Sequence, residues 1–272
     1  MKRKFKFLPV IIVALLFSCI LLFTDLLGVG GIGAKVLSNN TFSKKDNLIK
    51  KDKDFKIPEN PAASEQNLES TSSHPSSTQD TNVQRDKRLV VIDAGHGGSD
   101  TGSKQYGLVE KDITLDIALR LYDILKKSGV DTYMIRNTDV FIDHKERILL
   151  ANNMNASLFL SIHCDWYTNA SLHGTQTLYY PSKSLAIGNL VEIDYASIIQ
   201  QELANALETY DRGIDDRPDL AVLRHAKMPS VLVELAFLSN KSDAQLLATE
   251  DFRQKAAEAL YHGIRKSLAK ID

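Results

Sequence analysis

Cysteine is almost absent from this sequence. The chain has only 2 cysteines, and Cys19 lies in an apolar stretch near the N-terminus while Cys164 lies far along the chain. A framework of intramolecular disulfide bonds is therefore excluded. A folded domain in this chain must be held together by a conventional hydrophobic core or by a metal ion.

Net charge is nearly absent as well. The formal charge is -1 at pH 7, so the chain lacks the excess of lysine and arginine that neutralises the phosphates of a nucleic acid. We therefore expect no nucleic-acid partner. With 43% hydrophobic and 25% charged residues, the 272-residue chain has the composition of a globular protein of one or two domains, and it contains no internal repeat.

Long hydrophobic runs are missing except at the N-terminus. Residues 7–24 carry no charge and follow a basic flank, and such a run spans about 27 Å as a helix, close to the thickness of a bilayer core. We predict a cytoplasmic basic flank at 1–6 and a transmembrane signal-anchor at 7–27, with the remainder outside the cell. Two alternatives remain: cleavage within residues 28–34, which would secrete the protein to the cell wall, and lipid attachment at Cys19.

Residues 28–88 are predicted to form a flexible extracytoplasmic linker, because apolar residues are sparse from residue 38 onward and no periodicity is sustained. Residues 89–272 are predicted to form the folded domain, in which β-rich runs alternate with amphipathic stretches. The expected strands are 88–94, 130–136, 157–163, 174–180, 220–224 and 230–237, and the expected helices are 110–127, 143–153, 187–207 and 251–269. This alternation predicts a single α/β domain with a mixed, mostly parallel sheet of about six strands covered by helices on both faces.

Four polar residues stand out at the ends of these elements. His96 and His163 each come at the end of an apolar strand, Glu110 opens the first long helix, and Glu234 is enclosed in the run VLVELAFL. Ligands of open α/β sheets gather at the carboxyl ends of the strands, so these side chains could converge. Each also has a purely structural interpretation: a polar residue at a strand end for the histidines, a carboxylate favoured by the helix dipole for Glu110, and a salt bridge for Glu234.

Two imidazoles and one carboxylate suit a single catalytic Zn²⁺, because three protein ligands leave one position open for water. His96, Glu110 and His163 would supply these ligands. Glu234 would then act as the general acid/base, since a carboxylate between apolar neighbours is costly to bury unless it is paired, protonated or near a metal. The spacings are too long for a short zinc motif, so chemistry alone does not decide between these interpretations.

Four blocks of sequence carry a resemblance to a known family. In chain order they are VVIDAGHGGSDTGS, GLVEKDITLDIALRL, SIHCDW with HGTQTLYY, and LRHAKMPSVLVELAFLSNKSDAQLL. Together they resemble the zinc-dependent N-acetylmuramoyl-L-alanine amidases of the amidase 3 type over about residues 89–266. The resemblance implies that His96, Glu110 and His163 bind zinc and that Glu234 is the catalytic acid/base.

The resemblance also implies a substrate and a role. An enzyme of this family hydrolyses the amide between N-acetylmuramic acid and L-alanine in peptidoglycan, which suits an autolysin with an outward-facing domain. We expect peptidoglycan and, through the N-terminal segment, the cytoplasmic membrane as partners, and a monomeric catalytic domain. The alternatives are a zinc peptidase that cuts within the stem or cross-bridge peptide, and a wall-binding module without catalytic activity.

The sequence departs from the family pattern in two places. Ala94 stands where the family often has proline, and Cys164 and Asp165 stand where alanine and asparagine are common, so the substrate contacts of that loop need not follow the family. A thiol ligand at Cys164 is unfavourable, because adjacent strand residues point to opposite sides. Asp165 and Arg224 are candidates for substrate binding, Arg224 through a carboxylate. The remaining candidates, expected at the surface or in support of the site, are His144, His173 and His225.

Overall fold

The computed structural model describes residues 86–181 and 185–271. The predicted basic flank, membrane segment and nearly all of the predicted linker lie outside these residues. Within the described ranges, no helix is both long and apolar enough to pass through a bilayer. The first strand begins at Asp86, so the last residues of the predicted linker belong to the folded domain.

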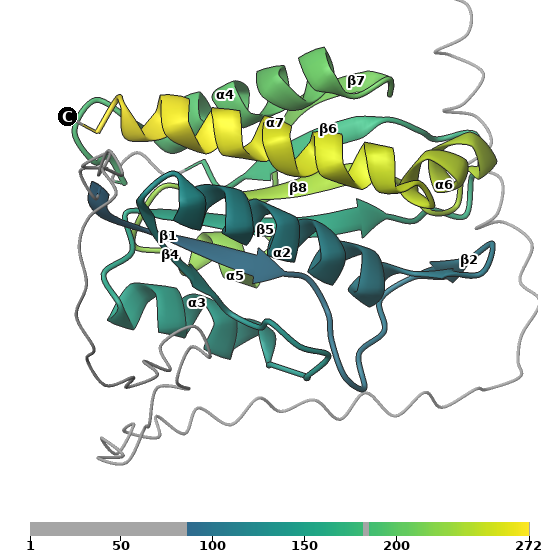
Figure 1. Cartoon of the computed structure of the whole chain (residues 1–272), viewed down its shortest axis with the longest axis horizontal. Coiled ribbons are helices and arrows are strands. Elements are labelled where there is room, and N and C mark those ends of the chain that lie inside the picture. Colours follow the sequence, from purple (N-terminus) through teal and green to yellow (C-terminus); the bar gives the residue numbers. More distant parts are fainter. Residues whose placement is uncertain (1–85, 182–184, 272) are drawn as a thin grey trace, which may run out of the picture. The chain divides into compact units, whose positions relative to one another are not determined.

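A six-stranded mixed sheet forms the centre of the described domain, as predicted (Figure 1). Its order is β4-β1-β5-β8-β6-β7, in which β4, β1, β5 and β8 are parallel and β6 pairs antiparallel with β8. The strands are β1 (Asp86–Ala94), β4 (Val130–Met134), β5 (Leu158–Asp165), β6 (Thr175–Tyr179), β7 (Asp211–Asp216) and β8 (Ser230–Phe237). A separate two-stranded hairpin consists of β2 (Lys104–Gln105) and β3 (Leu108–Val109).

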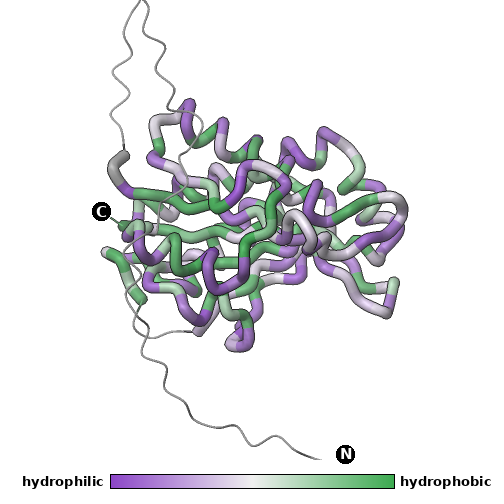
Figure 2. The backbone as a smooth tube through the Cα atoms, turned by 90° about the horizontal axis from the view of Figure 1, so that it is seen from below, coloured by the Kyte–Doolittle hydropathy of each residue, from purple (hydrophilic) through white to green (hydrophobic). Residues whose placement is uncertain are grey.

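Helices cover both faces of the sheet, also as predicted (Figure 1). The helices α2 (Glu110–Lys127), α4 (Glu192–Ala206) and α7 (Glu250–Leu268) pack on one face, and α3 (His144–Asn153) and α5 (Ala221–Arg224) pack on the other. A further helix, α6 (Lys241–Leu247), follows β8. In Figure 2 the hydrophobic colour is most continuous along the middle of the folded domain, and much of its periphery is hydrophilic.

Alternating residues of the central strands divide between two hydrophobic cores. In β1, Val90 and Ile92 join the core beneath α2, α4 and α7, whereas Val91 joins the core beneath α3 and α5. The same alternation in β5 sends Leu160 and Ile162 to the first core. His163 therefore points to the α3 and α5 side of the sheet, because successive strand residues point to opposite faces.

One predicted strand is wrong. Residues 220–224 form the short helix α5 after a turn at Leu220, not a strand. Four apolar residues followed by an arginine are too few for periodicity to separate a strand from a helix, and Val222 and Leu223 are also buried in a helical turn. The sixth strand of the described domain is instead β7, which pairs with β6 at the edge of the sheet.

Candidate metal centre

Three side chains from different elements meet at the carboxyl ends of β1 and β5. His96 follows β1, Glu110 opens α2, and His163 lies near the end of β5. The Glu110 Oε1 atom lies 3.0 Å from His96 Nε2 and 3.1 Å from His163 Nδ1, and the two imidazole rings pack edge to face with centroids 4.8 Å apart. The structure thus brings together the three residues that the sequence suggested as a metal-ligand set.

The backbone around His96 is held by two buried arginines. Arg136 Nε donates to the carbonyl of Ala94 at 2.8 Å, and its Nη2 donates to the carbonyl of Gly95 at 2.8 Å. Arg147 Nη2 donates to the carbonyl of His96 at 2.7 Å. His96 itself has a φ of 60°, in the left-handed region that non-glycine residues rarely adopt. These hydrogen bonds stabilise an unfavourable backbone conformation that aims the imidazole at Glu110.

Two glycines make room for the cluster. A Cβ atom on Gly95 would clash with the imidazole of His163. A Cβ atom on Gly102 would lie 2.6 Å from both Glu110 Oε2 and the His96 ring, and Gly102 has a φ of 60°. The close approach of this backbone to the cluster therefore requires residues without side chains.

Glu110 is buried, and both of its carboxylate oxygens have polar partners. Its Oε1 accepts from the backbone N–H of Cys164 at 3.1 Å, and its Oε2 accepts from that of Ser103 at 2.9 Å. Burial alone would raise the pKa of Glu110, but the hydrogen bonds and charges of His163 and His96 outweigh it and hold the pKa far below its usual range. Glu110 therefore presents a carboxylate, the form that binds a metal.

Asp100 orients His96 from the side opposite Glu110. Its Oδ2 lies 3.0 Å from His96 Nδ1, and its Oδ1 accepts from the backbone N–H of Gly102 at 3.1 Å. A carboxylate on one ring nitrogen fixes the tautomer that leaves the other nitrogen free for a metal. The sequence reasoning missed Asp100, although an acidic residue four positions after His96 was visible in the GHGGSD block.

These donors fit a zinc ion. Tetrahedral coordination with metal–donor distances near 2.0 to 2.1 Å spaces the donor atoms about 3.3 Å apart. The distances from Glu110 Oε1 to His96 Nε2 and to His163 Nδ1 are close to that value. One ligand atom from each of the three residues lies within 4.8 Å of the ligand atoms of the other two. Two imidazole nitrogens and one carboxylate oxygen are also a donor set that Zn²⁺ accepts.

Glu234 lies beside this cluster. It is the register partner of His163 on the neighbouring parallel strand β8, so both side chains point to the same face of the sheet. Its Oε2 is shut off from solvent and has no hydrogen-bond partner within the described residues. Burial and the charges of Asp165 and Glu110 raise the pKa of Glu234 well above its usual range, and Arg217 only partly opposes them.

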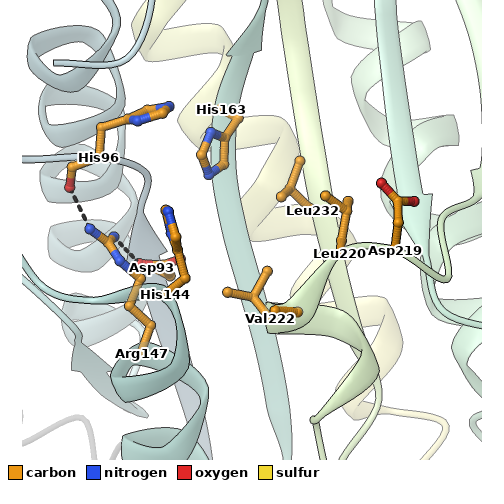
Figure 3. A pocket seen from close by; sticks show the side chains of 10 residues that line it. Asp93, His96, His144, Arg147, His163, Asp219, Leu220, Val222 and Leu232 are labelled. Atoms are coloured by element: carbon orange, nitrogen blue, oxygen red, sulfur yellow. Dashed lines mark hydrogen bonds and ion pairs between the residues drawn. The ribbon is translucent and has the colours of Figure 1, made fainter. Parts of the chain in front are cut away.

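A cavity of about 210 Å³ opens beside His96 and His163 (Figure 3). His96 and His163 line it together with His144, and the buried Asp93–Arg147 ion pair lies at one side. The opposite wall is mainly apolar and comes from α5, the turn before it and β8: Leu220, Ala221, Val222 and Leu232, with Asp219 beside them. The cluster is thus reached from a cleft rather than enclosed in the core.

The other sequence candidates lie in different surroundings. The Cys164 side chain is buried in the core under α2, α4 and α7, on the face opposite His163, and burial raises the pKa of its thiol. Arg224 is exposed on α5, donates to the carbonyl of Pro218 at 3.2 Å, and does not line the cavity.

Asp165 is half-buried, and burial raises its pKa although the charges of Arg212 and Arg217 lower it. Arg217, which the sequence reasoning missed, is thus within electrostatic reach of both Asp165 and Glu234.

The chain is similar in sequence to known proteins. A family model described as N-acetylmuramoyl-L-alanine amidase matches residues 90–266. The chain is 40% identical to the uncharacterized protein YqiI of Bacillus subtilis over 65% of this chain and 83% of that protein. It is 39% identical to the N-acetylmuramoyl-L-alanine amidase LytC of Bacillus subtilis over 64% of this chain, which covers only 34% of LytC.

A solved structure shares the fold as well. The N-acetylmuramoyl-L-alanine amidase AmiC2 of Nostoc punctiforme superposes with a TM-score of 0.63 at 33% sequence identity. The match covers 68% of this chain and 99% of that one.

Proposed function

This chain belongs to the N-acetylmuramoyl-L-alanine amidase family, and from that membership and the geometry of the cleft we propose that it hydrolyses the amide between N-acetylmuramic acid and L-alanine in peptidoglycan. The observation that carries the proposal is the convergence of His96, Glu110 and His163, with Glu234 in register beside His163. These are the residue types that a zinc amide hydrolase needs, arranged at the edge of an open cleft.

We propose that His96 Nε2, Glu110 Oε1 and His163 Nδ1 hold one Zn²⁺. When bound, the ion would supply Lewis-acid chemistry, polarising a carbonyl group and lowering the pKa of a water molecule. Asp100 keeps His96 in the required tautomer, and the N–H groups of Ser103 and Cys164 hold the Glu110 carboxylate in place.

Glu234 is the proposed general acid/base. It accepts a proton from the attacking water and passes it to the nitrogen of the leaving L-alanine as the carbon–nitrogen bond breaks. Its raised pKa suits this role, because a carboxyl group that exchanges protons near neutral pH must titrate above its ordinary range. The absence of a partner on Oε2 within the described residues leaves that atom available for the transferred proton.

The test is digestion of purified peptidoglycan by the full chain. We expect release of stem peptides with a free L-alanine amino group, loss of activity on chelation, recovery with Zn²⁺, and no activity for Glu234→Ala. Glu258→Ala, which replaces an exposed glutamate on α7, serves as the matched control and should retain activity. Activity that survives both chelation and Glu234→Ala would contradict the mechanism.

We further propose that residues 7–27 anchor the enzyme in the cytoplasmic membrane with the folded domain outside, and that this domain is monomeric. The uncharged run after a basic flank supports the anchor. Fractionation of cells that express the full chain separates the possibilities: an uncleaved chain in the membrane fraction supports the anchor, and a shortened chain in the wall or medium supports secretion. Light scattering of the purified domain measures the oligomeric state.

A further inference from the structure

The cavity beside the candidate metal centre is lined by three imidazoles, and the proposed function uses only two of them. The third belongs to His144, the first residue of α3. Its ring points toward the space between the His96 and His163 rings (Figure 3). Within residues 86–181 and 185–271, no hydrogen bond or ion pair engages this imidazole.

The backbone of His144 is fixed relative to the metal-ligand residues. Asp143 caps α3 by accepting from the N–H of Lys145 at 2.9 Å. Arg147 lies three residues after His144 and therefore on the same face of the helix. Its guanidinium bonds to Asp93 Oδ1 at 2.7 Å and to the carbonyl of His96 at 2.7 Å. The first turn of α3 is thus bound directly to the backbone that carries His96, as a precisely positioned functional group requires.

Few other side chains facing the cavity can donate a hydrogen bond to a ligand. The nitrogens of Arg147 are directed to the carbonyls of Ile142, Ala94 and His96 and to Asp93. Asp219 is an acceptor, and it is already paired with Arg217 at 2.9 Å. Two side-chain donors among the described residues that line the cavity have no partner: the imidazole of His144, and the Nε2 atom of His163, whose ring is already held at Nδ1 by Glu110. Of the two, only His144 has both ring nitrogens unpaired, and it lies opposite a mainly apolar wall. A group of this kind recognises an electron-rich oxygen.

We propose that a ring N–H of His144 donates a hydrogen bond to the carbonyl oxygen of the scissile amide as negative charge develops on it. This inference rests on the proposed function. When the water oxygen bonds to the carbonyl carbon, the π electron pair moves to this oxygen and the water proton goes to Glu234. The pair returns when the carbon–nitrogen bond breaks and the leaving nitrogen takes the proton. His144 donates a hydrogen bond throughout and transfers no proton.

The kinetic test uses the full chain loaded with Zn²⁺ and a soluble muropeptide. His144→Ala should lower kcat by about 100-fold or more with little change in KM, because a donor to the developing charge acts in the transition state and not in the ground state. His144→Gln keeps an N–H donor and should recover part of the loss. Lys145→Ala alters the exposed neighbouring residue and should leave kcat unchanged.

Binding provides a readout independent of turnover. A phosphinate that mimics the tetrahedral state of the lactyl–alanine amide should bind His144→Ala about 100-fold more weakly by calorimetry. The zinc content of the His144→Ala protein, its circular dichroism spectrum and its affinity for the product peptide should match those of the wild type.

Three results would overturn the inference while the wild type remains active: a change in KM alone, which indicates ground-state substrate binding; loss of zinc, which indicates support of the metal site; or no effect. A wild type that does not cleave the muramoyl–alanine bond would instead overturn the proposed function.

Discussion

Glu234 should destabilise the folded protein while enabling its chemistry. In zinc-free protein, Glu234→Gln removes the carboxyl group from a site where burial and the charges of Asp165 and Glu110 disfavour ionisation. A buried atom without a partner, such as Oε2 of Glu234, costs roughly 1 to 3 kcal/mol and more when it is charged, and glutamine keeps a polar atom there but cannot ionise. We therefore expect Glu234→Gln to raise the free energy of unfolding by about 1 to 3 kcal/mol at neutral pH. For a domain of this size, that corresponds to a rise in Tm of roughly 2 to 12 °C.

The gain should depend on pH with a definite sign. The pKa of Glu234 is higher in the folded state than in the unfolded state, so the folded state binds more protons across the interval between the two values. Wild-type stability therefore falls as pH rises above the unfolded pKa of about 4.3. Glutamine does not titrate, so the difference between variant and wild type should be small below about pH 4 and should grow toward neutral pH.

Urea unfolding from pH 4 to pH 8 in the presence of a chelator, followed by circular dichroism, measures this difference. Glu258→Gln, at an exposed position on α7, is the matched control and should shift stability little at any pH. The reasoning is refuted if Glu234→Gln is no more stable than the wild type at neutral pH, or if the difference between the two does not change with pH.

Three further substitutions test the support of the metal centre. Asp100→Asn should weaken zinc binding by about 10- to 100-fold in a chelator competition assay, because the carboxylate that orients His96 is lost; unchanged affinity would argue against that role. Gly95→Ala should abolish stoichiometric zinc binding, measured by elemental analysis, because the new Cβ displaces the ring of His163, and a full metal content would contradict the close contact. Cys164→Ala should keep both bound zinc and activity, because the thiol lies in the core on the opposite face of the sheet. It should lower the free energy of unfolding in urea by roughly 1 kcal/mol. Loss of zinc from this variant would indicate that the thiol is a metal ligand.

The sequence predicted the elements whose patterns are long or strongly apolar. The spacing of Ile113, Ile117, Leu121 and Leu125 predicted α2 with its observed bounds. An apolar residue at every fourth position over this length is typical of an amphipathic helix and excludes a strand, whose apolar residues alternate. The apolar strands β1, β5 and β8 were also predicted, and the rule that parallel strands present their carboxyl ends together anticipated the meeting of His96 with His163.

Short and polar elements escaped the same reasoning. Strand β7 has the sequence DRGIDD, and aspartate and glycine are unfavourable in strands. It forms because β6 offers a free edge, and charged residues are tolerated at the edge of a sheet. Helix α6 begins at an Asn240 cap and spans only seven residues, too few for a periodic signal.

The supports of the site depend on contacts that sequence spacing cannot reveal. Arg147 lies 51 positions from His96 and reaches its carbonyl only because α3 packs beneath β1. Arg136 is likewise 41 positions from Gly95. Neither arginine differs locally from an ordinary surface residue of its segment, so only the folded structure identifies them as the groups that hold the backbone around His96.

The most direct test of the central claim is the identity of the bond that is cut. Purified peptidoglycan is digested in ¹⁸O-labelled water by the zinc-loaded full chain, and the products are analysed by mass spectrometry. Hydrolysis of the muramoyl–alanine amide predicts ¹⁸O in the lactyl carboxylate of the glycan and unlabelled stem peptides that begin with a free L-alanine. Label in a peptide carboxylate, with new amino groups on residues other than L-alanine, would contradict the proposed amidase activity and identify a peptidase.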